Sequence, residues 1–327
     1  MSLGAGSASV LALALAVLFV SRRLLRRSAR ATKVSKRDER VLILGASSGI
    51  GRALAHEYAR RGARVCVTAR RTDELKKVVE ECSALQETRG ASAKETRALS
   101  VAADFTNVDE MVHLRDVLER DWSGVDTVIV CAGVSALRPL MEVAGLERDG
   151  RSFTPSQATA EGLKHTVDVA RKAVNVNYLG PLVSAVALLP LLQNTSQSPS
   201  ILLISSLAAL VPAPTRTLYG STKAASLMLY QSLSIEHPTV AFTFAVPATV
   251  RGGFRASAVD GGPVREANPD THGLRLEDVA ARCVRAVDDG EKFVWMPYVF
   301  GRFGQLGYWL VPRLVERLAG RKYNFTA

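Results

Sequence analysis

Cysteine is scarce in this sequence, and the positions of the few cysteines exclude two kinds of scaffold. Four cysteines stand far apart among 327 residues, and no two of them form a Cys-x-x-Cys pair. Disulfide frameworks and zinc sites need closely spaced cysteines, so we expect neither of these, nor any other metal site. Glycine and proline, at 24 and 13 residues, are too few for a collagen-like or low-complexity chain.

Long hydrophobic runs are also rare, which excludes a protein with several membrane spans. The exception is residues 3–20, which carry no charge and would form a helix of roughly 27 Å. An arginine cluster follows this run and no basic residue precedes it, which is the reverse of a cleaved signal peptide. We therefore predict a single-pass membrane anchor at residues 1–21, with a cleaved or disordered leader as the alternative.

Positive charge is confined to the two ends of the chain, although the formal net charge is +11. Residues 21–40 carry a net charge of +7, residues 291–327 carry +4, and the stretch between them is neutral. A neutral central domain lacks the basic surface of a nucleic-acid binder, so we expect no nucleic-acid partner. Residues 22–40 are predicted to be a basic juxtamembrane linker, which the positive-inside rule places in the cytosol.

Between these ends, short apolar runs alternate with helical stretches. Six runs are expected to be buried strands, at residues 41–44, 64–68, 99–102, 125–131, 201–204 and 240–246. Their alternation with helices predicts one α/β domain at residues 41–290, built on a single doubly wound parallel sheet of the Rossmann type. The aromatic-rich tail at residues 291–327 could face the membrane, cover a substrate cleft or pack on the core.

A glycine-rich turn follows the first predicted strand. Gly45, Gly49 and Gly51 stand where small residues let a pyrophosphate approach the N-terminus of the next helix. Arg70 and Arg71 follow the second strand, where a dinucleotide-binding fold contacts the adenosine ribose. Because arginine attracts a 2′-phosphate and no acidic residue stands there, the sequence favours NADP(H) over NAD(H).

A tyrosine and a lysine four residues apart stand at the start of a later helix. Tyr219 and Lys223 share one helix face at this spacing, and a lysine so close is expected to lower the pKa of the phenol. Ser206, 13 residues upstream, ends the preceding strand and could hold a carbonyl oxygen in line with that phenol. Each of these pairings is common alone, but all three residues occur here in a predicted nucleotide-binding fold. Together they indicate acid-base chemistry at a carbonyl or hydroxyl group of the substrate.

Taken together, these motifs resemble the short-chain dehydrogenase/reductase family over about residues 40–290. The matching segments are Gly45–Gly51, Val67–Arg70, Asp104, Val176–Gly180, Ile204–Ser206 and Tyr219-x-x-x-Lys223, and Val130–Gly133 stands where Asn-Asn-Ala-Gly is usual. The resemblance implies that Tyr219 passes a proton to or from the substrate oxygen and that Ser206 orients this oxygen. It further implies that Lys223 binds the nicotinamide ribose and tunes the tyrosine, and that Asn177 holds a helix kink and a water of the proton relay.

The same resemblance implies a set of cofactor contacts. These are Gly45, Ser47, Ser48, Gly49, Ile50, Gly51, Arg70, Asp104, Ala132, Gly133, Asn177, Tyr219, Lys223, Pro247 and Thr249. Asp104 would lie near the adenine, but it has an equally good structural explanation as a cap of the helix that follows.

Three features depart from the family pattern. Val130-Cys131 replaces a pair of asparagines that normally ties neighbouring strands together, so that support must come from elsewhere. Pro247-Ala248-Thr249 replaces the common Pro-Gly and leaves the nicotinamide contacts less defined. Residues 142–166 are a polar surplus that could be a surface loop, an oligomer contact or a lid.

The expected reaction is the interconversion of a ketone and a secondary alcohol. The anchor, the apolar tail and the apolar loop at residues 207–212 indicate a lipid-soluble substrate. The resemblance favours the membrane-anchored reductases of 3-keto sphingoid bases, with 11-beta-hydroxysteroid dehydrogenase-like enzymes and other steroid or retinoid-type carbonyl reductases as the alternative. It implies a location in the endoplasmic reticulum membrane with the catalytic domain in the cytosol, and it allows a homodimer. A catalytically inactive NADP-binding scaffold at a membrane is an alternative of another class.

Overall fold

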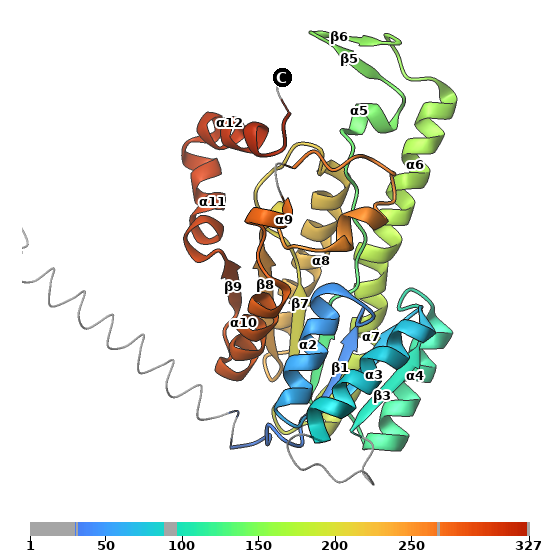
Figure 1. The fold of residues 1–327 in the computed structure, drawn as a ribbon, viewed down its shortest axis with the longest axis vertical. Helices are drawn as coiled ribbons and strands as arrows, with labels where there is room; N and C mark the ends of the chain where they lie inside the picture. The colour runs from blue at the N-terminus through green and yellow to red at the C-terminus, as the bar shows by residue number, and fades with distance from the viewer. Residues whose placement is uncertain (1–29, 31, 88–96, 267–268, 326–327) are drawn as a thin grey trace, which may run out of the picture.

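The structure is a computed structural model that describes residues 30, 32–87, 97–266 and 269–325. The anchor predicted at residues 1–21 and most of the basic linker lie outside these residues. The described chain forms a seven-stranded parallel sheet with helices on both faces (Figure 1). This confirms the doubly wound α/β fold expected from the sequence.

The strand order places the first strand near the centre of the sheet. The order is β3-β2-β1-β4-β7-β8-β9, and every neighbouring pair is parallel. The strands are β1 (Arg40–Leu44), β2 (Arg64–Ala69), β3 (Ala98–Ala102), β4 (Thr127–Val130), β7 (Ser200–Ile204), β8 (Ala241–Pro247) and β9 (Phe293–Met296). The chain winds one way from β1 to β2 and β3 and the other way from β4 onward. The carboxyl ends of β1 and β4 therefore border the crevice in which such sheets bind ligands.

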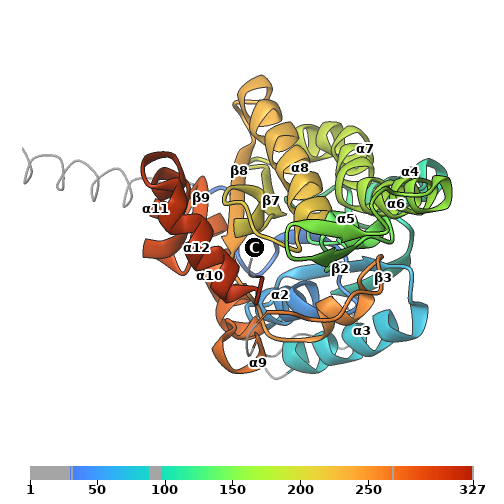
Figure 2. The same cartoon turned by 90° about the horizontal axis from the view of Figure 1, so that it is seen from above.

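Two helix layers bury the sheet because its strands are apolar on both faces. Val41 and Ile43 of β1 belong to one core cluster with α2 (Gly49–Arg60), α3 (Thr72–Glu87) and α10 (Leu276–Asp289). Leu42 and Leu44 belong to the other cluster with α4 (Val108–Trp122), α7 (Gly180–Thr195) and α8 (Thr217–Glu236). Figure 2 shows the two layers from above. Successive side chains of a strand point to opposite faces, which explains the continuous apolar runs of the sequence.

The surplus at residues 142–166 forms a small projection of its own. It contains the end of α5 (Leu140–Val143), a hairpin of β5 (Glu147–Asp149) and β6 (Ser152–Thr154), and the start of α6 (Ala160–Val174). All six hairpin residues are exposed, and the hairpin extends beyond the sheet at the top of Figure 1.

One continuous helical run connects this projection to the core. It extends from Ala160 to Thr195 and includes the π-helical turn η1 (Asn175–Leu179) between α6 and α7. By length and composition this run could cross a membrane, but core helices of soluble proteins meet the same criteria, and 44% of its most apolar stretch is buried within the protein. The irregular turn lies just before Gly180 and Pro181, the first two residues of α7.

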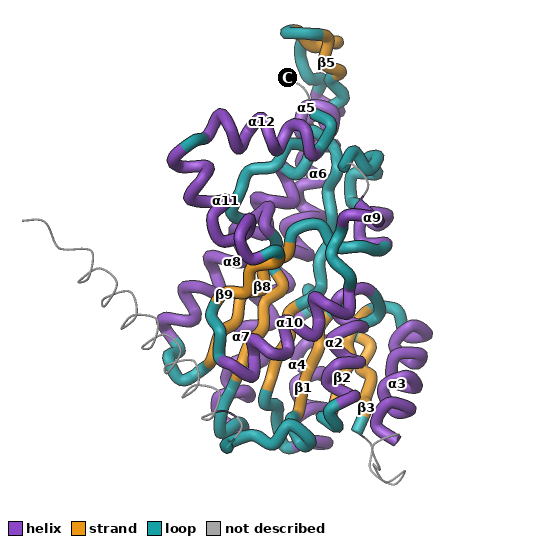
Figure 3. The backbone as a smooth tube through the Cα atoms, turned by 60° about the vertical axis from the view of Figure 1, so that its left-hand side comes forward, coloured by secondary structure: helices purple, strands orange, loops and turns teal. Residues whose placement is uncertain are grey.

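The chain continues the sheet beyond residue 290, where the sequence placed the domain boundary. β9 pairs with β8 and forms the edge of the sheet, so the start of the aromatic tail is part of the domain. Two helices follow it, α11 (Tyr298–Leu310) and α12 (Pro312–Lys322). Figure 3 shows them in succession beyond the end of β9.

Candidate active site

The glycine-rich turn after β1 has the tight geometry that its glycines predict. Gly45 has φ +91°, and a Cβ there would lie 2.5 Å from the backbone nitrogen of Ala132. A Cβ at Gly51 would collide with the carbonyl oxygen of Gly45, and Gly49 begins α2 with φ +58°. These conformations and contacts are available only to glycine, so the turn passes close beneath the space where a pyrophosphate would lie.

The N-terminus of α2 is left open toward this space. Ser48 occupies the N-cap position but makes no side-chain capping hydrogen bond, and the first turn has no acidic residue. The positive end of the helix dipole is therefore uncompensated, which suits an anionic ligand. Ile50 is partly buried and packs against the core cluster under the helix.

Two arginines after β2 flank the glycine-rich turn. Arg71 donates hydrogen bonds to the hydroxyls of Ser47 and Ser48, at 2.9 and 3.0 Å. Arg70 is 70% exposed, and its guanidinium lies 3.8 Å from the carboxylate of Asp104. The sequence singled out Arg70 for the 2′-phosphate, but Arg71 is the arginine that reaches the turn.

Asp104 stands after β3 at the same edge of the sheet. One of its oxygens accepts hydrogen bonds from the backbone N–H and the hydroxyl of Thr106, at 3.0 and 2.8 Å. Asn107 is the N-cap of α4, because it accepts hydrogen bonds from the N–H groups of Asp109 and Glu110. Asp104 thus shapes the turn before the helix. Its position at this edge of the sheet is also compatible with the predicted place beside the adenine of the cofactor.

Asn177 joins three elements of the candidate site. It is fully buried in η1, where its side chain accepts a hydrogen bond from the N–H of Val134 and donates one to the carbonyl of the same residue, at 2.9 and 3.0 Å. It also donates to the hydroxyl of Thr222 in α8, at 3.0 Å. The asparagine therefore fixes the loop after β4 against η1 and the catalytic helix.

Gly133 brings that loop close to the catalytic groups. A Cβ at this position would lie 3.1 Å from Oδ1 of Asn177 and 3.2 Å from Nζ of Lys223. At the preceding Cys131, where the family pattern has an asparagine, the backbone supplies the support. The N–H groups of Cys131 and Ala132 both donate to the carbonyl of Leu44, at 3.0 and 2.9 Å.

The expected catalytic pair lies at the start of α8. Tyr219 is partly accessible, and its hydroxyl makes a hydrogen bond with the side chain of Ser206, which follows β7. Lys223 is buried and donates a hydrogen bond to the carbonyl of Ile204, at 3.1 Å. The structure thus brings Ser206, Tyr219 and Lys223 together at the carboxyl end of β7, with Asn177 held nearby by Thr222.

Burial sets the protonation of this pair. It raises the pKa of Tyr219, although the hydrogen bond with Ser206 and the charges of Arg216 and Arg255 act in the opposite direction. The pKa of Tyr219 is therefore raised, where the sequence led us to expect a lowered value, because desolvation of the phenolate has the largest effect. Burial also lowers the pKa of Lys223 to about 8. At neutral pH the tyrosine is a phenol and the lysine is mostly charged.

Pro247 and Thr249 occupy the end of β8 and the loop after it. Pro247 is the last residue of the strand, at the carboxyl edge of the sheet. The hydroxyl of Thr249 donates a hydrogen bond to the carboxylate of Glu266. This hydroxyl is therefore engaged by a neighbouring acid, a partner that the sequence did not indicate.

Glu266 is the centre of a buried charged cluster that sequence reasoning missed. Its carboxylate lies 3.0 Å from Arg255, 3.7 Å from Arg216 and 3.3 Å from Lys322 of α12. The guanidinium of Arg216 also lies 5.7 Å from the centre of the Tyr323 ring. The charges of both arginines act on Tyr219, so the cluster lies near this candidate catalytic residue. These residues come from four separate segments, and no sequence motif links them.

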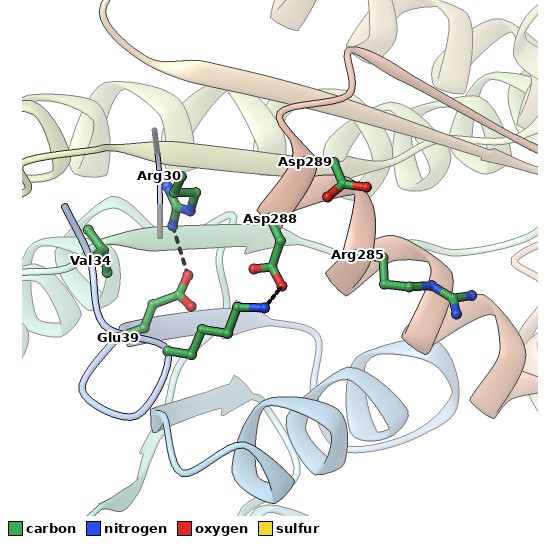
Figure 4. A pocket seen from close by; sticks show the side chains of 7 residues that line it. Arg30, Val34, Glu39, Arg285, Asp288 and Asp289 are labelled. Carbon is green, nitrogen blue, oxygen red and sulfur yellow. Dashed lines mark hydrogen bonds and ion pairs between the residues drawn. The ribbon is translucent and has the colours of Figure 1, made fainter. Parts of the chain in front are cut away.

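A cavity of about 370 Å³ lies at the opposite edge of the sheet, before β1 and at the end of α10 (Figure 4). It is lined by Arg30, Val34, Lys36, Glu39, Arg285, Asp288 and Asp289. Its charges pair with one another, for example Arg30 with Glu39 at 2.8 Å and Lys36 with Asp288 at 2.9 Å. The cavity is therefore separate from the candidate active site.

Comparisons with known proteins identify the family to which this sequence is related. A family model described as short chain dehydrogenase matches residues 39–260. The 11-beta-hydroxysteroid dehydrogenase A of Sesamum indicum is 26% identical over 278 residues, which cover 82% of this chain and 70% of that protein. The dehydrogenase/reductase SDR family protein 7-like of Dictyostelium discoideum is 30% identical over 216 residues, which cover 66% of this chain and 60% of that protein.

Solved structures show the same fold. An alcohol dehydrogenase from the archaeon Thermococcus sibiricus, complexed with 5-hydroxy-NADP, superposes with a TM-score of 0.59 at 24% identity, covering 78% of this chain and 94% of its own. A short chain dehydrogenase/reductase from Burkholderia phymatum, in complex with NAD, gives a TM-score of 0.66 at 18% identity, covering 87% and 96%. At these identities the likeness concerns the fold.

Proposed function

From the premise that this chain belongs to the short chain dehydrogenase family of oxidoreductases, we propose that it is an NADP(H)-dependent enzyme that interconverts a ketone and a secondary alcohol on a lipid-like substrate. The observation that carries this proposal is the grouping of Asn177, Ser206, Tyr219 and Lys223 beside the glycine-rich turn. Asn177 and Lys223 are buried, whereas Ser206 and Tyr219 are partly accessible, so a substrate can reach the two hydroxyl groups.

The residues present fit a dinucleotide. The turn at Gly45 and Gly51 leaves no room for side chains, and the open N-terminus of α2 would hold the pyrophosphate. The buried ammonium of Lys223 would bind the nicotinamide ribose. The bound nicotinamide supplies or accepts the hydride in this chemistry.

Arg70 and Arg71 support NADP(H) as the preferred cofactor. Arg71 already reaches the turn through Ser47 and Ser48, while Arg70 is held only by an exposed ion pair with Asp104. Guanidinium groups bind phosphate through paired hydrogen bonds, and the segment after β2 offers no acid to bind a 2′-hydroxyl. A 2′-phosphate would therefore be held between the two arginines.

Tyr219 would move the proton. Because burial raises its pKa, the phenol keeps its proton at neutral pH and can donate it to the oxygen of a ketone. Ser206 would hold the same oxygen through its hydroxyl. The charge of Lys223 would stabilise the phenolate that forms, and the network of Asn177 and Thr222 would keep α8 in register with the loop after β4.

The charged cluster bears on the choice of lipid ketone. Arg216, Arg255 and Lys322 surround a single carboxylate, that of Glu266, so the region beside Tyr219 is positive. A positive region disfavours a cationic substrate such as a 3-keto sphingoid base. We therefore rank a neutral or anionic ketone of the steroid or retinoid type first and the 3-keto sphingoid base second. The names of several relatives, such as 11-beta-hydroxysteroid dehydrogenase A, support this order.

The proposed setting is the endoplasmic reticulum membrane, with the catalytic domain in the cytosol. The uncharged run at residues 3–20 and the arginine cluster after it support this orientation.

We also propose a homodimer, because α7 and α8 expose the apolar side chains of Val186, Met228 and Ile235 at 71%, 64% and 78%. The mass of the detergent-solubilised protein, measured by light scattering, tests the dimer.

The test of the cofactor and substrate proposals uses the full chain in detergent. Nicotinamide fluorescence during titration with NADPH and NADH measures the two affinities, and Arg70→Ala with Arg71→Ala should remove the preference for NADPH. Parallel assays then compare a steroid ketone with a 3-keto sphingoid base. Equal affinity for both nucleotides would refute the NADP(H) assignment, and faster turnover of the sphingoid base would reverse the substrate order.

A further inference from the structure

The helix α11 exposes its large apolar side chains. Val299, Trp309 and Leu310 are 69%, 75% and 71% exposed, and Tyr298, Phe303 and Leu306 are more than half exposed. At 100° per residue, these positions fall on one face of the helix. A surface helix normally turns such a face toward the core, so α11 has the opposite orientation.

The inner face of α11 explains why this orientation is fixed. It is lined by glycines, and a Cβ at Gly301 would lie 3.1 Å from Cβ of Trp295. A Cβ at Gly304 would lie 3.1 Å from Val211, and one at Gly307 would lie 3.7 Å from Val315 of α12. The close approach leaves little space for large side chains. The apolar face therefore cannot rotate inward without moving the helix away from β9.

The next helix adds basic charge beside more exposed leucines. In α12, Leu314 and Leu318 are 52% and 47% exposed, and Arg313, Arg317 and Arg321 are exposed beside them. α11 contributes the exposed Arg302 and has no acidic residue, and Glu316 is the one acid of α12. By the same rotation, Arg302 falls within the apolar face of α11. An apolar face with arginines on it and beside it is the pattern of a helix that lies in the interface of a lipid bilayer, where long basic side chains reach the headgroups.

We propose that this face of α11 and α12 docks on the surface of an anionic phospholipid bilayer. The name tail face is used for Tyr298, Val299, Phe303, Leu306, Trp309, Leu310, Leu314 and Leu318. Its arginines complement lipid phosphates, because the two helices carry four exposed arginines and a single acid, Glu316. A second copy of the chain fits less well, because facing copies would bring the same arginines together.

A short linker would join the predicted anchor to the core. Arg30 is fixed to the core by hydrogen bonds to Glu39 and Thr127, at 2.8 and 2.7 Å. Nine residues separate it from the uncharged run that ends at Val20, and an extended segment of this length covers about 30 Å. A bilayer that holds this run would therefore lie within about 30 Å of Arg30.

The docked helices also lead to the candidate active site. α12 ends at Lys322, which pairs with Glu266, and the next residue, Tyr323, lies against Arg216. The contact with lipid would therefore place the catalytic side of the domain near the bilayer. The proposal itself concerns the tail face alone and holds whether or not the protein is a reductase.

Tryptophan fluorescence tests the proposal in the full chain. Trp122 and Trp295 are buried, at 7% and 9% exposure, and the predicted anchor has no tryptophan, so Trp309 is the one tryptophan in a position to meet lipid. The protein is reconstituted into vesicles of phosphatidylcholine and phosphatidylserine whose acyl chains do or do not carry bromine. We expect brominated lipid to quench part of the emission in the wild type and not in Trp309→Phe.

Two charge-introducing variants complete the design. Phe303→Glu combined with Leu310→Glu should abolish the quenching by brominated lipid. Leu163→Glu, on the 58% exposed leucine of α6 at the other side of the domain, should leave it unchanged (Figure 2). Quenching of Trp309 by acrylamide but not by brominated lipid would overturn the proposal. So would protection from both quenchers, which would indicate a protein partner such as a second copy.

Discussion

The protonation of Lys223 gives the sharpest quantitative prediction. Burial lowers its pKa from 10.5 to about 8, which corresponds to roughly 3 kcal/mol of penalty on the buried ammonium. The lysine is therefore charged below about pH 8 and neutral above it. If the ammonium binds the nicotinamide ribose, kcat/KM for NADPH should decrease above pH 8, approaching tenfold per pH unit. This parameter reports the free enzyme, which is the state that the structure describes.

The matched control is Lys223→Arg, because a guanidinium keeps its charge over the whole range. This variant should have lower activity but no decrease near pH 8. Tyr219 cannot produce the decrease, since burial raises its pKa above the ordinary value of 10.0. A decrease near pH 8 that persists in Lys223→Arg, or a wild-type profile that stays flat to pH 10, would refute the reasoning.

Three further variants test separate contacts. Arg71→Ala should weaken NADPH binding about tenfold to a hundredfold and leave NADH binding nearly unchanged, as titration of both nucleotides would show. Gly133→Ala should lower kcat and reduce the free energy of unfolding by about 1–3 kcal/mol, because the new Cβ would contact the ammonium of Lys223. A variant with unchanged kcat would contradict this geometry. Glu266→Gln should destabilise the fold by about 3 kcal/mol or more, since it leaves Arg255 without its acid, and a thermal unfolding midpoint equal to that of the wild type would count against the cluster.

The parts of the fold that the sequence predicted depend on local patterns. The glycine-rich turn could be predicted because its glycines stand close together directly after an apolar run, although the close approach that requires Gly45 comes from the distant Ala132. The six predicted strands are short apolar runs between helical stretches, and each is present in the sheet. The candidate catalytic residues follow the carboxyl ends of such strands at fixed spacings. Because the strands are parallel neighbours, the order of the sheet brings these residues together at one edge.

The features that the sequence did not predict depend on distant contacts. β9 has the composition of the aromatic tail, and only its pairing with β8, about 50 residues earlier in the chain, makes it a strand. The cluster around Glu266 joins Arg216 and Lys322, which are more than 100 residues apart. The raised pKa of Tyr219 depends on burial by several elements rather than on the neighbouring lysine. None of these has a periodicity or a motif of its own.

The central claim is that Tyr219 transfers the proton when NADPH reduces a lipid ketone. The most direct measurement follows NADPH consumption by the full chain with steroid ketones and with a 3-keto sphingoid base, for the wild type and for Tyr219→Phe. We expect turnover by the wild type and a loss of about 10²- to 10⁴-fold in the variant, with NADPH binding retained. Equal rates in the two proteins would exclude Tyr219 as the proton donor. NADPH binding without turnover of either ketone class would instead favour the inactive scaffold.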